Sequence, residues 1–576
     1  MLEIIRARWG DTAHKVFFVF AILTNIIVCS MLLLGGASVC NALTGMNLYA
    51  GESPPPPLAS VGCAAPARAA PGAGSHRLPC APISAAHPPA HARPAAAMLI
   101  PIGVIMYTAH GGLKATFMST YLHTVVVFVA LCLFSLQVYA SYDLLGSPAK
   151  VWENLTAMAT FKPVADNKEG SYLTMYSKSG FIFGVINIIG NFGTVFVDQA
   201  YWMGAIASKP SASYKGYILG GLCWFSIPFT LATSLGLAGV ALDLPITRTE
   251  AGNGLVPPAV AVEMMGKGGA VWIFVMLFMA VTSTGSAELI AVSSLFSYDF
   301  YRTYINPKAT GKDIIRVSRY VIVGFGVLMG VLAIILFEIG LSLGWVYLFM
   351  GIAIGGAVAP IYMCLVWSKA SATGAIVGAI SGTVLGLITW LVTCQGLEGA
   401  INVDLLGGDY PMLAGNLVAI FGSLIICAVI SLMNPQNYDW QTTREIATVD
   451  EAALEGPVAD EDSPEAMDKA FKVMLYVGWG LSLILIVVWP ALALIPGVFS
   501  KSYFTFWVIL SITWGMLATV VSTFLPLIES WSSISTVLVN LFSCSSPAED
   551  AATAVPGDFA KQAFPAPSFA AKGVEA

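Results

Sequence analysis

The sequence predicts an all-α polytopic membrane protein, and three observations support this fold class. Hydrophobic residues make up 57% of the 576 residues, charged residues make up only 10%, and the mean hydropathy is +0.78. Soluble globular proteins usually carry about 25% charged residues. Apolar runs of about 20 residues, the length of helix that crosses a bilayer, recur along the chain. These runs lack the period-two alternation that a membrane β-barrel requires.

Eleven of the apolar runs are long enough to cross a membrane as helices. They cover residues 14–36, 118–143, 179–205, 215–240, 269–295, 317–339, 344–368, 371–394, 411–433, 472–495 and 503–528. A shorter run at 98–112 brings the predicted number of spans to about twelve. The lipid bilayer is therefore an expected partner of the chain.

The distribution of Lys and Arg predicts the orientation of the spans, because cytoplasmic loops are enriched in these residues. The basic cluster between Arg302 and Arg319 lies inside if the N-terminus, with Arg6 and Arg8, is cytoplasmic. Alternation of the spans then places the C-terminal tail inside as well. We expect a multi-pass plasma-membrane protein with both termini in the cytoplasm.

Four segments lie outside the predicted spans. Residues 144–178 form a predicted extracellular loop, and the acidic residues 434–470 form a predicted cytoplasmic loop. Residues 51–97 are rich in Ala and Pro and have no periodicity, so we expect a disordered insertion, either a translated non-coding stretch or a lineage-specific loop. Residues 531–576 are a predicted disordered tail.

The stretch Asn187–Trp202, NIIGNFGTVFVDQAYW, is unusually polar for a membrane span. Asn191, Thr194 and Asp198 follow one another at helical spacing, and a carboxylate inside a span costs about 2.5–3.5 kcal/mol on insertion scales. A broken helix that presents polar and backbone groups to a small polar solute explains this pattern. A kinked helix whose polar groups bond to neighbouring helices explains it as well.

Ala280, Ser283 and Thr284 share one face of a later span and could supply a carbonyl and two hydroxyls to Na⁺. Ser and Thr in membrane helices also bond to the carbonyl one turn earlier or allow close packing, which is the commoner role. Glu288 is either a group that carries a proton or an acceptor from a neighbouring helix. The glycines of Phe349–Pro360 predict close helix packing.

The remaining sequence excludes several classes of function. We find no nucleophile–base pair, metal-binding cluster or phosphate-binding loop, so an enzyme is not expected. No cofactor is expected beyond a coupling ion. A formal net charge of −6 is too small for this length to indicate a nucleic-acid partner.

Four stretches, GNFGTVFVDQAYW, GSAELIAVSSLFSYDFYRTYINPKATGK, MYTAHGGLKATF and TFLPLIESW, resemble the urea active transporters, a branch of the sodium:solute symporter family. The resemblance covers residues 1–50 and 98–530. It implies a LeuT-like fold of ten core helices in two inverted repeats, with the first and sixth core helices broken. Residues 1–50 and 98–143 would be core helices three to five, 179–368 helices six to ten, and 369–530 additional spans.

The resemblance also implies a function and a set of site residues. We expect import of urea by symport with H⁺ or Na⁺ and alternating access. Urea would be bound by Asn191, Thr194, Asp198 and Gln199. The resemblance assigns Ala280, Ser283 and Thr284 to an incomplete Na⁺ site, and Glu288 and Asp198 are candidates for proton coupling.

The sequence departs from the family pattern in three places. Met203 and Gly204 stand where the family usually has Gln-Arg, and residues 51–97 are inserted. The start, MLEIIRARWG, matches only from the loop before the third core helix, so we expect core helices one and two to be missing. Two alternatives therefore stay open: a truncated product without transport activity, and a symporter for polyamines or another small amide-like solute.

Overall fold

The computed structural model describes residues 1–44, 93–208, 210–444, 464–531 and 535. Within these residues the regular structure is almost wholly helical, with two isolated β-bridges. Among the described residues, eleven helices are long and apolar enough to cross a membrane. The predicted all-α, membrane-spanning class is confirmed. Most of the predicted insertion 51–97, part of the loop 434–470 and most of the tail 531–576 lie outside the described residues.

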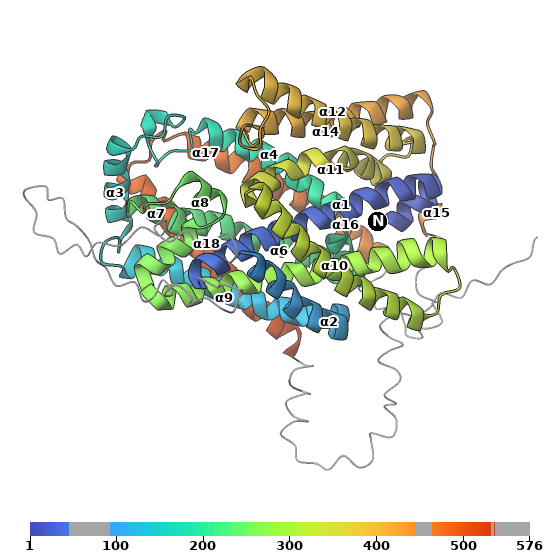
Figure 1. Ribbon diagram of the computed structural model, residues 1–576, viewed down its shortest axis with the longest axis horizontal. Coiled ribbons are helices and arrows are strands. Elements are labelled where there is room, and N and C mark those ends of the chain that lie inside the picture. Colours follow the sequence, from blue (N-terminus) through green and yellow to red (C-terminus); the bar gives the residue numbers. More distant parts are fainter. Residues whose placement is uncertain (45–92, 209, 445–463, 532–534, 536–576) are drawn as a thin grey trace, which may run out of the picture.

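The helices follow the chain in an order close to the predicted one (Figure 1). Those in the first part are α1 (Leu2–Thr44), α2 (Arg93–Leu136), η4 (Gln137–Ser141), α3 (Pro148–Phe161), η5 (Lys168–Gly170), α4 (Lys178–Val197), α5 (Gln199–Ala207), α6 (Pro210–Leu231), η6 (Ala232–Gly236), α7 (Leu237–Ala241) and α8 (Arg248–Gly252).

The remaining helices include the long candidate span formed by α9, which is kinked at Gly266, and η7. They are α9 (Val256–Ser294), η7 (Leu295–Ile305), α10 (Gly311–Ile339), α11 (Leu343–Val366), α12 (Ala372–Glu398), α13 (Val403–Leu406), α14 (Asp409–Met433), α15 (Gln441–Arg444), α16 (Pro464–Leu483), η10 (Ile484–Val488), α17 (Trp489–Leu494) and α18 (Lys501–Glu529).

The described residues contain eleven candidate spans where twelve apolar runs were predicted, because the run 98–112 and most of the run 118–143 both fall in α2, whose two helical parts join at a kink. The two runs meet at a kink at Gly112, where φ is 57° and ψ is −154°. Only glycine adopts this backbone conformation without strain. Similar kinks occur at Gly10 in α1 and Gly266 in α9.

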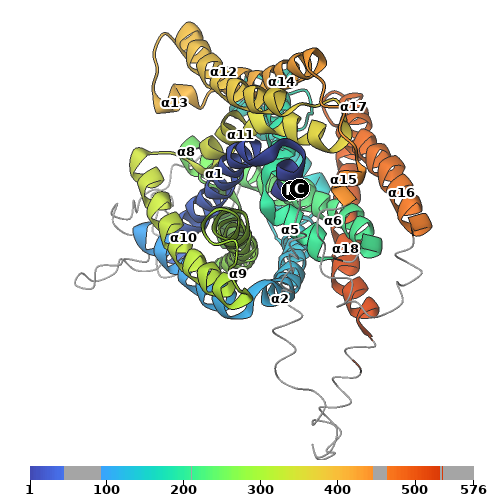
Figure 2. The same cartoon turned by 90° about the vertical axis from the view of Figure 1, so that its right-hand side faces the viewer.

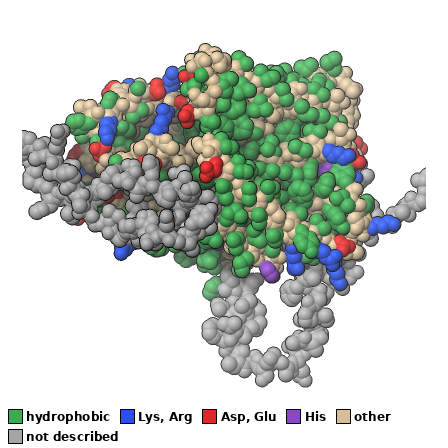
Figure 3. All heavy atoms as spheres, in the orientation of Figure 1, with side chains coloured by type: hydrophobic (Ala, Val, Ile, Leu, Met, Phe, Trp, Pro, Cys, Tyr) green, Lys and Arg blue, Asp and Glu red, His purple; other side chains and the backbone are tan. Residues whose placement is uncertain are grey.

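Eight of the long helices pack in two groups of four (Figures 1 and 2). One contains α1, α2, α9 and α10, which contact one another, and the other contains α4, α11, α12 and α14. Helix α1 contacts both groups through α9 and α11. On the face seen in Figure 3, hydrophobic side chains cover the middle of the molecule and charged side chains gather toward its two ends. This distribution is the one expected for a protein surrounded by lipid.

Helices α12 and α14 approach closely along a stripe of glycines spaced four residues apart. A Cβ atom at Gly378 would lie 2.9 Å from Cys427 Cβ, and one at Gly382 would lie 2.6 Å from both Ala419 O and Ser423 Cβ. Small residues at this spacing let membrane helices pack backbone to backbone. The packing predicted for Phe349–Pro360 is also confirmed, with its glycines against α4, α12 and α14.

A buried arginine joins segments that are far apart in the sequence at one end of the molecule. The Arg8 guanidinium donates to the carbonyls of Trp367, Ser368 and Ala370 at 2.6, 3.1 and 3.1 Å. It also lies over the Tyr438 and Trp440 rings, 4.9 and 5.2 Å from their centroids. The cation therefore caps the carbonyl end of α11 and ties α1 to the start of the 434–470 loop.

Candidate functional site

The polar segment 187–202 contains a helix break, and the break lies at Asp198. Helix α4 ends at Val197, Asp198 has extended backbone angles (φ −76°, ψ 120°), and α5 begins at Gln199. Asp198 Oδ1 accepts a hydrogen bond from Ala200 N at 2.8 Å and so caps α5. The aspartate therefore satisfies part of the backbone that the break exposes.

Gly190 and Gly193, the two glycines of this span, do not interrupt α4. Gly190 packs against α11 and α14, where a Cβ atom would lie 3.8 Å from Gly351 Cα and 3.6 Å from Asn416 Oδ1. A Cβ at Gly193 would lie 3.0 Å from Val358. Close packing of this kind offsets the low helix propensity of glycine.

Asp198 and Glu288 both accept hydrogen bonds from the side chain of Asn25, a residue that the sequence alone did not single out. Asn25 Nδ2, from the middle of α1, donates to Asp198 Oδ1 at 3.1 Å and also to Glu288 Oε2 of α9. Exposure is 0% for Asn25 and 1% for each carboxyl residue. Because both oxygens lie within reach of one nitrogen, they are no more than about 6 Å apart.

The electrostatics of this cluster favour neutralisation of one carboxyl group. No Lys, Arg or His of the described residues forms an ion pair with either carboxyl. The other titratable groups facing the pair are Cys29 on α1 and Tyr201 on α5. Two charges no more than about 6 Å apart repel by at least about 3 kcal/mol at an effective dielectric constant of 20. A single proton bound by the pair removes this repulsion.

Two polar atoms beside the carboxyl pair have no hydrogen-bond partner within the described part of the chain. They are the Asn25 Oδ1 acceptor and the Gln199 Nε2 donor, and both are buried. A buried polar atom without a partner costs about 1–3 kcal/mol. Atoms of this kind therefore mark a place where a polar ligand, a proton or water gains hydrogen bonds.

The residues expected to bind solute and ions are distributed as follows. Gln199 is buried directly after Asp198, whereas the side chains of Asn191 and Thr194 lie outside the described residues, within the backbone of α4. Ser283 Oγ donates to Thr120 Oγ1 at 3.3 Å, and Thr284 is exposed. The structure thus brings Asp198, Gln199 and Glu288 together, and Ser283 contacts α2 instead.

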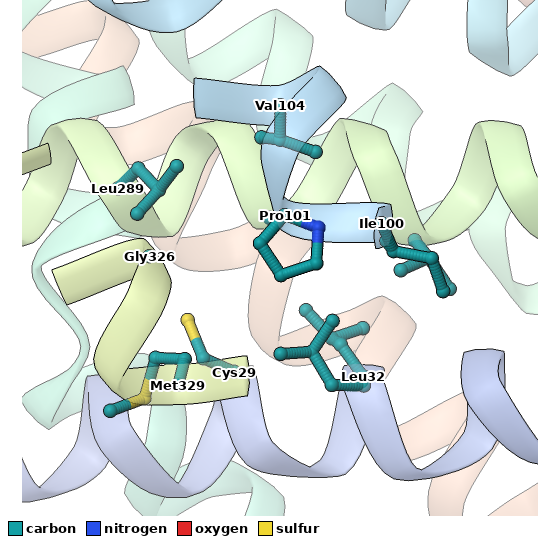
Figure 4. A pocket seen from close by; sticks show the side chains of 11 residues that line it. Cys29, Leu32, Ile100, Pro101, Val104, Leu289, Gly326 and Met329 are labelled. Carbon is teal, nitrogen blue, oxygen red and sulfur yellow. The ribbon is translucent and has the colours of Figure 1, made fainter. Parts of the chain in front are cut away.

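An apolar pocket borders the carboxyl cluster (Figure 4). Its wall includes Cys29, one helical turn beyond Asn25, and Leu289, next to Glu288. The other labelled residues come from α1, α2 and α10, and Pro101 of α2 points toward the centre. Apart from the weakly polar thiol of Cys29, the side chains of this lining are apolar. They keep the region beside the carboxyls low in dielectric constant.

Comparisons with known proteins identify the class. Residues 94–382 match the sodium:solute symporter family. The chain is 48% identical over 557 residues to the Urea-proton symporter DUR3 of Oryza sativa subsp. japonica, covering 94% of this chain and 71% of the relative. It is 40% identical over 482 residues to the Urea active transporter of Saccharomyces cerevisiae, covering 81% of this chain and 59% of the relative. It is 35% identical over 551 residues to the Probable urea active transporter 1 of Schizosaccharomyces pombe, covering 94% and 76%.

The chain therefore belongs to the sodium:solute symporter family. Membership carries with it the LeuT-like fold that the resemblance implied, and it confirms a transporter rather than an enzyme. Among solved structures, a Na⁺-coupled sialic acid symporter in a substrate-bound outward-open state matches 74% of this chain and 76% of its own, at 15% identity and a TM-score of 0.48.

Proposed function

We propose that this protein imports urea across the plasma membrane by proton symport, with both termini in the cytoplasm. One observation carries the proposal: Asp198 and Glu288 are buried together on the amide of Asn25, without a basic partner among the described residues. The names of the urea-transporting relatives support the solute, and the name of the rice relative supports the ion.

Urea fits the chemistry beside the helix break. It is neutral, its carbonyl accepts hydrogen bonds, and its two amino groups donate them. Gln199 Nε2 is a buried donor, and Asn25 Oδ1 is a buried acceptor. Asn191 and Thr194 precede Asp198 by about two turns and one turn of α4, so they would complete the solute contacts.

The transport of urea is coupled to that of the proton if both bind more tightly to the same conformation of the protein. A proton taken up from outside neutralises one carboxyl group of the pair, and the pair then tolerates a neutral solute at the break. Proton binding that raises the affinity for urea requires that urea raise the affinity for the proton by the same factor. Release of both on the cytoplasmic side completes an alternating-access cycle.

Na⁺ coupling through Ala280, Ser283 and Thr284 is the alternative. The two ions are separated by uptake of labelled urea into proteoliposomes that contain the purified chain, under a pH gradient or a Na⁺ gradient applied separately. We expect uptake under the pH gradient alone. Uptake that requires Na⁺ at every pH would overturn proton coupling.

Two further arms of the same experiment test the site and the solute. Glu288→Gln removes the titrating group but keeps its shape, so we expect uptake to lose its dependence on the pH gradient. Competition by an excess of unlabelled polyamine tests the other solute class, because a buried carboxyl pair also attracts cations. Polyamine competition stronger than that of unlabelled urea would refute urea as the solute.

A further inference from the structure

We infer that Asn25 makes the carboxyl pair selective for a proton over Na⁺. This inference rests on the proposed proton coupling and names the residue that determines the ion. Asn25 lies in the apolar run of α1, contacts both carboxyls, and is completely buried. No other described side chain donates a hydrogen bond to both groups.

The amide nitrogen occupies the position that a cation would need. A hard cation is bound by several oxygen atoms, and two facing carboxylates would otherwise provide the strongest of them. Here Asp198 Oδ1 and Glu288 Oε2 both accept from one NH₂ group, whose hydrogens carry partial positive charge. Na⁺ could enter only by displacing this group and leaving its two donors buried and unpaired, which costs about 1–3 kcal/mol for each donor.

A proton is accommodated by the same amide. With both carboxyls ionised, each accepts from Asn25 Nδ2, and Asn25 Oδ1 is left without a partner. When one carboxyl takes a proton from the aqueous side, it gains an O–H donor. Rotation of the amide then lets Oδ1 accept from that O–H, while Nδ2 keeps its bond to the remaining carboxylate. Loss of the proton to water on the other side restores the first arrangement.

Asn25→Asp tests the inference because it replaces the NH₂ group with oxygen at nearly constant shape. We expect Na⁺, compared with K⁺, to raise the melting temperature of the purified variant by several degrees in a saturable manner, since three carboxyl groups then face one position. In proteoliposomes, we expect the ratio of urea uptake with a pH gradient to uptake without one to fall toward one.

Asn41→Asp is the matched control. Asn41 lies on the same helix, is also buried, and its Oδ1 also lacks a partner among the described residues, but it is sixteen residues from Asn25, about 24 Å along α1. We expect no Na⁺-dependent stabilisation in this variant. An equal effect of Na⁺ on Asn41→Asp and Asn25→Asp, or no effect on a folded Asn25→Asp protein, would refute the role of Asn25.

A measurement on the unmodified chain keeps the inference testable if the variant does not fold. The infrared band of protonated carboxyl groups is titrated in NaCl and in KCl. We expect the same titration midpoint in both salts, whereas a Na⁺-dependent shift overturns the selectivity assigned to Asn25. Failure of the unmodified chain to transport urea would count against the proposed function, and these salt-dependent readouts would still decide the role of Asn25.

Discussion

His14 of α1 and Asp299 of η7 form a buried contact, with His14 Nε2 3.3 Å from Asp299 Oδ1. Tyr304 completes it, its hydroxyl lying 2.7 Å from His14 Nδ1. This cluster is in register with the site: Asn25 lies eleven residues after His14, and Glu288 lies eleven residues before Asp299. Eleven residues are about three helical turns, so both polar contacts lie along the same antiparallel contact between α1 and α9–η7.

Replacement of Asp299 by Asn should destabilise the protein by about 1–3 kcal/mol, because the buried His14 ring loses its charged partner. The midpoint of unfolding in a denaturing detergent measures this loss. Urea uptake should keep its pH dependence, since the carboxyl pair is about 16 Å away along α1. A variant with normal stability but an altered pH profile would instead place Asp299 on the proton path.

Arg8→Lys should also be destabilising, although it conserves the charge. The guanidinium reaches the carbonyl of Met363 inside α11 and that of Ala370 beyond its end, and it lies over two aromatic rings. An ammonium group cannot reproduce this planar, multiply bonded arrangement. We expect a loss of about 2–3 kcal/mol, measured by the same unfolding assay. Arg6→Lys is the control, because Arg6 is exposed and pairs only with Asp11 among the described residues.

Gly382→Ala should separate α12 from α14. The new methyl group would meet backbone and side-chain atoms at 2.6 Å, so the helices must move apart, at a cost of about 1–3 kcal/mol. Gly396→Ala on the same helix has open space and should be neutral or slightly stabilising. Thermal denaturation of the two variants side by side measures the difference, and equal melting temperatures would contradict the predicted role of the stripe.

Gly112→Ala should destabilise the kink of α2 by about 1–3 kcal/mol. A Cβ atom there meets nothing within 4 Å, so the cost comes from the backbone conformation alone. Gly103→Ala, in a regular part of the same helix with equally open space, should not be destabilising. If both variants unfold at the same temperature, the conformation assigned to Gly112 is wrong.

The apolar runs were sufficient to predict the class of fold and most spans, because bilayer thickness fixes their length. The break near Asp198 was also predictable, since a carboxylate at membrane depth requires compensation. Asn25 was missed, although an amide inside an apolar run is the same kind of signal. Its importance depends on contacts with residues 173 and 263 positions away, and a single sequence does not reveal such contacts.

The difference between the predicted and the observed boundaries of the spans has a similar cause. The run 98–112 looked like a separate short span because Gly111–Gly112 and the following Lys interrupt its hydrophobicity. In the structure the two helical parts of α2 meet at Gly112, which has backbone angles that other residues avoid. Composition alone does not distinguish a kink from a loop.

Asn416 of α14 is buried beside the first half of the interrupted helix. Its Nδ2 donates to Leu348 O of α11 at 3.0 Å and to Met412 O at 2.8 Å, and its Oδ1 faces the contact between Gly190 and Gly351. This junction packs α4 against α11 and α14. Beyond Asp198, α5 is a separate nine-residue segment that packs mainly on α9. If the proposed transport cycle moves this region, we expect α5 to move about Asp198 while α4 keeps its contacts.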